Sequence, residues 1–74
     1  MNRHPFWIIE SGTRPGFYLV YQGGLGEDSN QWTPDPLRAL RFAANERSDF
    51  VFSNSVQAEK PRWRHIEIGY AFLD

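Results

Sequence analysis

The chain has 74 residues, a formal net charge of −1 and no cysteine, which fits one small domain and excludes disulfides and thiolate metal sites. This charge argues against binding nucleic acid by charge alone, and the lack of a long apolar run argues against a membrane span. Aromatic residues make up 16% of the chain, which indicates a core of few, large side chains. We expect residues 1–74 to form a single domain in a cytoplasm, with residues 1–5 as a loose N-terminal arm.

The first half of the chain predicts an antiparallel hairpin. Residues 6–11 (F-W-I-I-E-S) and 17–22 (F-Y-L-V-Y-Q) are short runs rich in β-branched and aromatic residues. The sequence G-T-R-P-G at 12–16 has a glycine at each end and a proline inside, which is typical of a turn. Residues 23–30 (G-G-L-G-E-D-S-N) predict a flexible loop. A phosphate-binding loop is not expected here, because such a loop needs a helix and usually a lysine directly after the glycines, and acidic residues follow them instead.

The sequence at 32–42 (W-T-P-D-P-L-R-A-L-R-F) contains the clearest helix start in the chain. Asp35 can accept a hydrogen bond from a first-turn N–H, and Pro36 suits the first helical position. The Thr33-Pro34 pair favours an extended chain before the helix. We therefore expect Trp32 to enter from a strand or loop and to pack beside the helix start.

Two alternatives remain for the length of this helix. In the first, one helix runs from residue 35 to about residue 47, and the β propensity of F-V-F at 50–52 predicts a strand at 49–53. In the second, a helical turn at 36–40 and an extended step at 41–42 precede a main helix from about residue 45 to 58. Asn45 would then cap the main helix, and Glu46 would lie in its first turn, where the helix dipole favours an acid.

The same stretch resembles the pattern W-T-x-D-P-x-x-A-x-R-F of small, mostly uncharacterised phage and prophage proteins. In that family a hairpin precedes the pattern, and an acidic helix and a final strand with a Val/Ile-Glu pair follow it. The resemblance implies this order of elements and a bacterial host cytoplasm, and it assigns no chemistry. Ser53-Asn54-Ser55 depart from the helix-prone stretch expected there, which favours the second alternative for the helix. The matching residues are Trp32, Thr33, Asp35, Pro36, Ala39, Arg41, Phe42 and Ile66-Glu67.

Residues 63–72 (W-R-H-I-E-I-G-Y-A-F) predict the last strand, because apolar side chains alternate along them. Ile66, Ile68, Tyr70 and Phe72 would share one face of this strand. Gly69 is a candidate bulge or point of close backbone approach. The predicted fold class is α+β, with a three- or four-stranded antiparallel sheet and one main helix packed on one face, in the order ββαβ or ββαββ.

Both faces of the hairpin are apolar, since Phe6 and Ile8 alternate with Trp7 and Ile9. One helix covers one face, so the far face is expected to be an exposed interface or to be covered by residues 23–31, Trp32 or the N-terminal arm. The interface alternative predicts a non-enzymatic interaction module that binds another protein or a second copy of itself as a homodimer, and the resemblance implies that the other protein is of host or phage origin. The predicted interface residues are Trp7, Ile9, Tyr18, Val20, Trp63, Arg62 and Arg64.

Two other functions have some support in the sequence. Arg62-Trp63-Arg64 interleaves cations with an aromatic ring, which makes binding of single-stranded nucleic acid the alternative function. His65 and Glu67 would share a strand face and could form an acid–base pair. The sequence supplies no nucleophile beside a base and no set of metal ligands to go with them. An exposed pair of polar side chains without catalytic function is the commoner arrangement. We therefore predict no catalytic, metal-binding or cofactor-binding residue.

Overall fold

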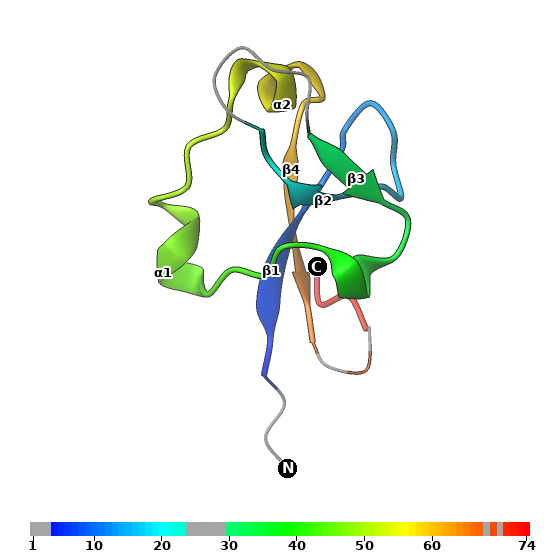
Figure 1. The fold of residues 1–74 in the computed structure, drawn as a ribbon. Helices are drawn as coiled ribbons and strands as arrows, with labels where there is room; N and C mark the ends of the chain where they lie inside the picture. Colours follow the sequence, from blue (N-terminus) through cyan, green and yellow to red (C-terminus); the bar gives the residue numbers. More distant parts are fainter. Residues whose placement is uncertain (1–3, 24–29, 68, 70) are drawn as a thin grey trace.

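The computed structural model describes residues 4–23, 30–67, 69 and 71–74. Within this part of the chain, four strands form one antiparallel sheet in the order β3-β2-β1-β4 (Figure 1). This arrangement confirms the predicted α+β class and the predicted hairpin, which is the β1–β2 pair. The strands are β1 (Phe6–Glu10), β2 (Tyr18–Tyr21), β3 (Gln31–Thr33) and β4 (Arg62–Ile66). The first residues of the predicted arm, 1–3, and most of the predicted loop, 24–29, lie outside the described residues.

The helical segments are short, so the prediction of one main helix is wrong. They are the 3-10 turn η1 (Pro36–Arg38), α1 (Ala44–Arg47) and α2 (Asn54–Ala58). Asp35 caps η1 as predicted, because its Oδ1 accepts the Leu37 N–H at 3.0 Å. The helical turn followed by an extended step agrees with the second alternative, but the main helix of that alternative is divided in two. No helix in the described part of the chain is long and apolar enough to cross a bilayer.

The chain between α1 and α2 is held in a form that is neither helix nor strand. The Gln22 side chain binds it at two points: its Nε2 donates to the Val51 carbonyl at 3.0 Å, and its Oε1 accepts the Ser53 N–H at 2.8 Å. Ser53 then caps α2, since its Oγ accepts the Val56 N–H at 3.3 Å. Ala43, and not the predicted Asn45, precedes α1. These bonds take up main-chain groups that a continuous helix would pair within itself.

The last strand is shorter than predicted. β4 ends at Ile66, and Phe72 forms an isolated antiparallel bridge back to Ile66. Gly69, with φ of 103°, lies in the turn between them, because glycine adopts positive φ without a steric penalty. The prediction of one strand over residues 63–72 is therefore wrong beyond Ile66, and the assignments of Ile68 and Tyr70 lie outside the described residues.

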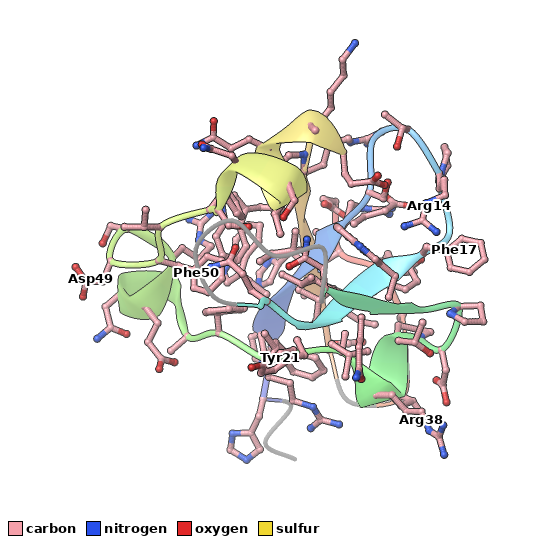
Figure 2. The ribbon with its side chains drawn as sticks, turned by 45° about the horizontal axis from the view of Figure 1, so that its top comes forward. Arg14, Phe17, Tyr21, Arg38, Asp49 and Phe50 are labelled. Atoms are coloured by element: carbon pink, nitrogen blue, oxygen red, sulfur yellow. The ribbon has the colours of Figure 1, made fainter. Side chains whose placement is uncertain are left out.

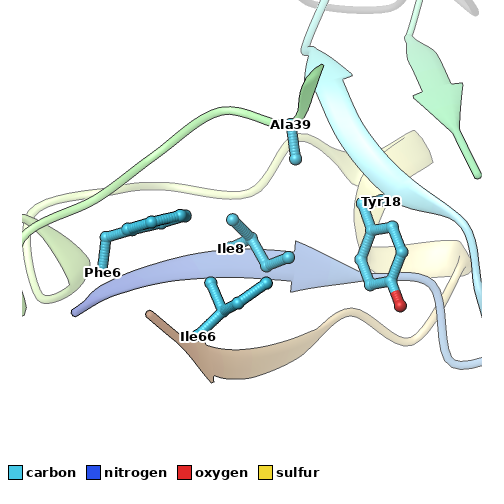
Figure 3. Packing of buried hydrophobic residues seen from close by; sticks show 5 residues of the cluster. All are labelled: Phe6, Ile8, Tyr18, Ala39 and Ile66. Carbon is cyan, nitrogen blue, oxygen red and sulfur yellow. The ribbon is translucent and has the colours of Figure 1, made fainter. Parts of the chain in front are cut away.

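The core consists of one apolar cluster on each face of β1. Phe6 and Ile8 belong to the first cluster and Ile9 to the second, as expected for side chains that alternate along a strand. Of the two alternatives for the far face of the hairpin, the structure shows the covered one, because short segments pack on both faces. The first cluster is Phe6, Ile8, Tyr18, Ala39 and Ile66 (Figure 3), and the partly buried Phe72 packs against it. The second is Ile9, Leu19 and Val56, with Trp32, Phe42, Phe50, Phe52 and Trp63 packed against it.

Trp32 is part of this second covering layer, which agrees with one of the predicted covers. It lies in β3 and packs on the α2 side of the sheet, whereas Ala39, which follows η1, packs on the opposite side. The prediction that Trp32 packs beside the helix start is therefore wrong.

Candidate interaction site

Four aromatic rings, those of Phe42, Phe50, Phe52 and Trp63, form an aromatic cluster on the α2 side of the sheet. The Phe42 ring meets Phe50 and Trp63 edge to face, with centroids 4.9 and 5.1 Å apart. These separations are typical of stabilising aromatic pairs. Phe42 is fixed beside β1 because it exchanges two main-chain hydrogen bonds with Trp7, of 2.8 and 2.9 Å.

Arg47 lies at the border of the aromatic cluster. Its guanidinium carbon is 3.7 Å from the centroid of the Trp7 ring and 5.9 Å from that of Trp63. The Trp7 ring in turn stacks on His65, with centroids 4.2 Å apart and planes 6° from parallel. The ion pairs of the described residues do not include Arg47. The charge of Arg47 is thus placed against aromatic faces, where the ring quadrupole attracts a cation.

A shallow, open pocket lies beside the aromatic cluster and is lined by Phe42, Glu46, Asp49 and Phe50; we call it the acidic hollow. The two rings supply its apolar lining, and the two carboxylates supply its charge. Glu46 lies in α1 and Asp49 follows its end; the Asp49 N–H donates to the Glu46 carbonyl at 3.2 Å, so the two side chains stand three residues apart on one turn. Figure 2 shows Asp49 at the outer edge of the molecule and Phe50 inward of it.

The two carboxylates of the acidic hollow differ in their bonding. Glu46 Oε1 accepts the Ala43 N–H at 2.7 Å, which orients its side chain. The Asp49 carboxylate has no hydrogen bond and no ion pair within the residues that the structure describes. Both residues are exposed. The hollow therefore presents one oriented and one free carboxylate beside two aromatic rings, which is suited to a cation carried on an apolar stem.

Val51 follows Phe50 and is 78% exposed. The hydrogen bond from Gln22 holds the Val51 main chain, and so the segment that carries this exposed side chain. An exposed hydrophobic residue next to the acidic hollow extends the surface that a partner could contact.

The structure buries part of the predicted interface. Ile9 is fully buried, and Tyr18 is 6% exposed. Tyr18 pairs with Glu10 across the strands, so it lies on the face opposite Ile9 and Trp7. Ile9 and Tyr18 thus have almost no surface to offer a partner, which corrects their assignment to one exposed face. Trp7 and Val20 are half-buried.

The Arg62-Trp63-Arg64 triplet does not form a continuous exposed strip. Trp63 belongs to the aromatic cluster, and Arg64 pairs with Glu10 through Nη1 at 2.7 Å and with Asp74 through Nε at 3.1 Å. Burial alone would lower the pKa of Arg64, but the hydrogen bonds and charges of Glu10 and Asp74 outweigh burial and raise the pKa. Arg62 is exposed.

His65 and Glu67, the possible acid–base pair of the sequence, and the buried Ser11 are engaged in structure. His65 stacks on Trp7, and Glu67 is buried rather than exposed. The buried Ser11 hydroxyl donates to Glu59 Oε1 at 2.9 Å, and its hydrogen bond, with those from Thr13 and Arg14, lowers the pKa of Glu59. The described part of the chain holds no group of three or more His, Cys, Asp or Glu residues that could hold a metal ion.

Sequence reasoning missed the acidic hollow because it assigned residues 49–53 to a helix or a strand. One signal was present: Glu46 and Asp49 stand three residues apart, immediately before the aromatic Phe50.

No protein-family model, curated protein or solved structure is significantly similar to this chain. The function of the site is therefore judged from its own geometry and chemistry.

Proposed function

We propose that this domain is a non-enzymatic interaction module that binds a protein partner through the acidic hollow and Val51. The observation that carries the proposal is the free Asp49 carboxylate beside the Phe42 and Phe50 rings, next to a valine that is 78% exposed. Protein interfaces combine apolar contact with a polar rim, and their strongest contacts centre on aromatic and arginine side chains in pockets. The acidic hollow supplies both kinds of surface on a segment that Gln22 holds in place.

The resemblance to phage and prophage proteins supports a partner of phage or host origin in a bacterial cytoplasm. The absence of cysteine agrees with a reducing compartment. A second copy of the chain is the other source of a protein partner, and it would use this same surface, because short segments cover both faces of the hairpin.

Binding of single-stranded nucleic acid has weaker support. The carboxylates of Glu46 and Asp49 would repel a phosphate backbone, and Arg64 is already paired with two carboxylates. Nuclease treatment in the experiment below distinguishes this alternative from a protein partner.

The test is affinity capture from a bacterial lysate by the immobilised domain, with and without nuclease, read by mass spectrometry. Val51→Asp places a charge at the proposed surface, where the exposed side chain makes folding insensitive to the change. Ala58→Asp adds the same charge at an exposed position of α2 and is the matched control.

We expect a stoichiometric protein that survives nuclease, binds the wild type and Ala58→Asp, and is lost with Val51→Asp. Sedimentation of the three proteins would show self-association as a dimer that Val51→Asp dissociates. A protein that Val51→Asp still captures at wild-type level, or recovery that disappears with nuclease, would contradict the proposed function.

A further inference from the structure

We infer that the acidic hollow receives an arginine side chain of the protein partner. The guanidinium would lie against the Phe42 and Phe50 rings and donate hydrogen bonds to the carboxylates of Asp49 and Glu46. This inference rests on the proposed function, since the arginine belongs to the partner that the module binds.

The first support is the use of the same contact elsewhere in the chain. Several arginines lie over aromatic rings, at 3.7 Å for Arg47 on Trp7 and 4.6 Å for Arg41 on Phe6. Arg64 lies over Phe72 at 4.1 Å, and Arg14 lies over Trp32 at 5.6 Å. Among the residues described, the arginines that lie over rings use neither Phe42 nor Phe50. These two rings line an open pocket and are available to a cation from outside.

The second support is the uncompensated negative charge of the hollow. Glu46 and Asp49 enter none of the ion pairs in the described ranges. The two arginines nearest in sequence, Arg41 and Arg47, lie on the rings of Phe6 and Trp7. A cation from a partner would therefore add attraction without displacing an existing ion pair.

The third support distinguishes arginine from lysine. A guanidinium is planar, stacks on aromatic rings and presents five donors that match carboxylate oxygens, whereas an ammonium is a compact and strongly hydrated point charge. The two carboxylates supply acceptors for the edge of the planar group, and the rings, which meet edge to face, supply an apolar surface for one of its faces. The exposed Val51 would contact an apolar residue next to the arginine in the partner's chain.

The test is a titration followed by amide chemical shifts in two-dimensional ¹H–¹⁵N spectra of the whole chain. The probes are N-acetyl-argininamide, N-acetyl-lysinamide and N-acetyl-citrullinamide, the last a neutral analogue of the arginine compound with nearly the same shape. We expect saturable shifts at Glu46, Asp49, Phe50 and Val51 with the arginine compound, weaker shifts with lysine, and none with citrulline. Added salt should weaken the binding.

Three variants test which features of the acidic hollow bind the arginine compound. Asp49→Asn should weaken binding of N-acetyl-argininamide about fivefold, the order expected for one exposed ion pair. Ala58→Lys changes the net charge by the same amount on α2 and should alter the affinity less than about twofold. Phe50→Leu keeps an apolar side chain and removes the aromatic face, so it should also weaken arginine binding.

Four results would overturn the inference: equal shifts with the citrulline compound, tighter binding of the lysine compound, unchanged binding by Asp49→Asn, or shifts centred on other residues.

The experiments distinguish failure of the arginine inference from failure of the proposed function. If a captured protein depends on Val51 but argininamide neither binds nor competes with it, the arginine inference fails and the proposed function stands. If argininamide binds as expected and no protein is captured, the chemistry of the hollow stands and the proposed function fails.

Discussion

Replacing Arg64 by methionine should destabilise the domain by about 2–4 kcal/mol. The Glu10 side chain is 6% exposed and is bonded to Arg64 Nη1 at 2.7 Å and to the Gly16 N–H at 2.7 Å. Removing the guanidinium leaves the carboxylate buried without its cation, which costs about 3–5 kcal/mol for a fully buried pair. Because the Arg64 side chain is 20% exposed, water screens part of the ion pair. We therefore expect a loss of about 2–4 kcal/mol, less than for a fully buried pair.

The measurement is urea unfolding followed by tryptophan fluorescence. A domain of this size has a free energy of unfolding of about 5–10 kcal/mol, so the Arg64→Met protein remains folded and its loss is measurable. The double variant Glu10→Gln with Arg64→Met removes the buried charge and should recover about 1–2 kcal/mol over Arg64→Met alone. Arg62→Met deletes the same charge at the exposed neighbouring position and should stay within about 0.5 kcal/mol of the wild type.

A loss below about 1 kcal/mol for Arg64→Met, or costs that simply add in the double variant, would refute the structural role of this pair. If Arg64→Met kept its stability and instead lost the captured protein, Arg64 would belong to the binding surface, as the sequence alone predicted.

Three further changes test other parts of the fold. Val56→Ala should cost about 2–3 kcal/mol in urea unfolding, because Val56 is fully buried against Ile9 and Leu19; a loss below about 1 kcal/mol would mean that α2 is not anchored in the core. Asp35→Ala should cost about 1 kcal/mol in thermal unfolding and Asp35→Asn less, and no difference between the two would contradict the cap. Glu59 has a lowered pKa in the folded state, so its stabilisation is present above its ordinary value of 4.5 and is lost as the pH falls through the folded pKa. The melting temperature of Glu59→Gln should therefore fall less than that of the wild type on acidification below 4.5, and parallel curves would exclude this role.

The features that sequence reasoning predicted correctly rest on local physics. The two β-rich runs joined by Gly12–Gly16 form the β1–β2 hairpin, and Asp35 caps a helical turn because a cap needs only its own neighbours. The prediction failed where distant residues decide. The Gln22 side chain holds Val51 and Ser53, which lie 29 and 31 residues away, and so divides the predicted helix.

The sequence by itself determined the α+β class, the hairpin and the apolar character of both its faces. Only the tertiary structure decided which side chains share a face and what covers them. Tyr18 opposes Glu10, and a shift of one residue in this register would turn every side chain of the strand to the other side of the sheet. Arg64 pairs with Glu10, 54 residues away, a partner that the sequence alone does not identify. Alternation within a strand is a local property, but register and long-range pairing depend on the packing of the whole chain.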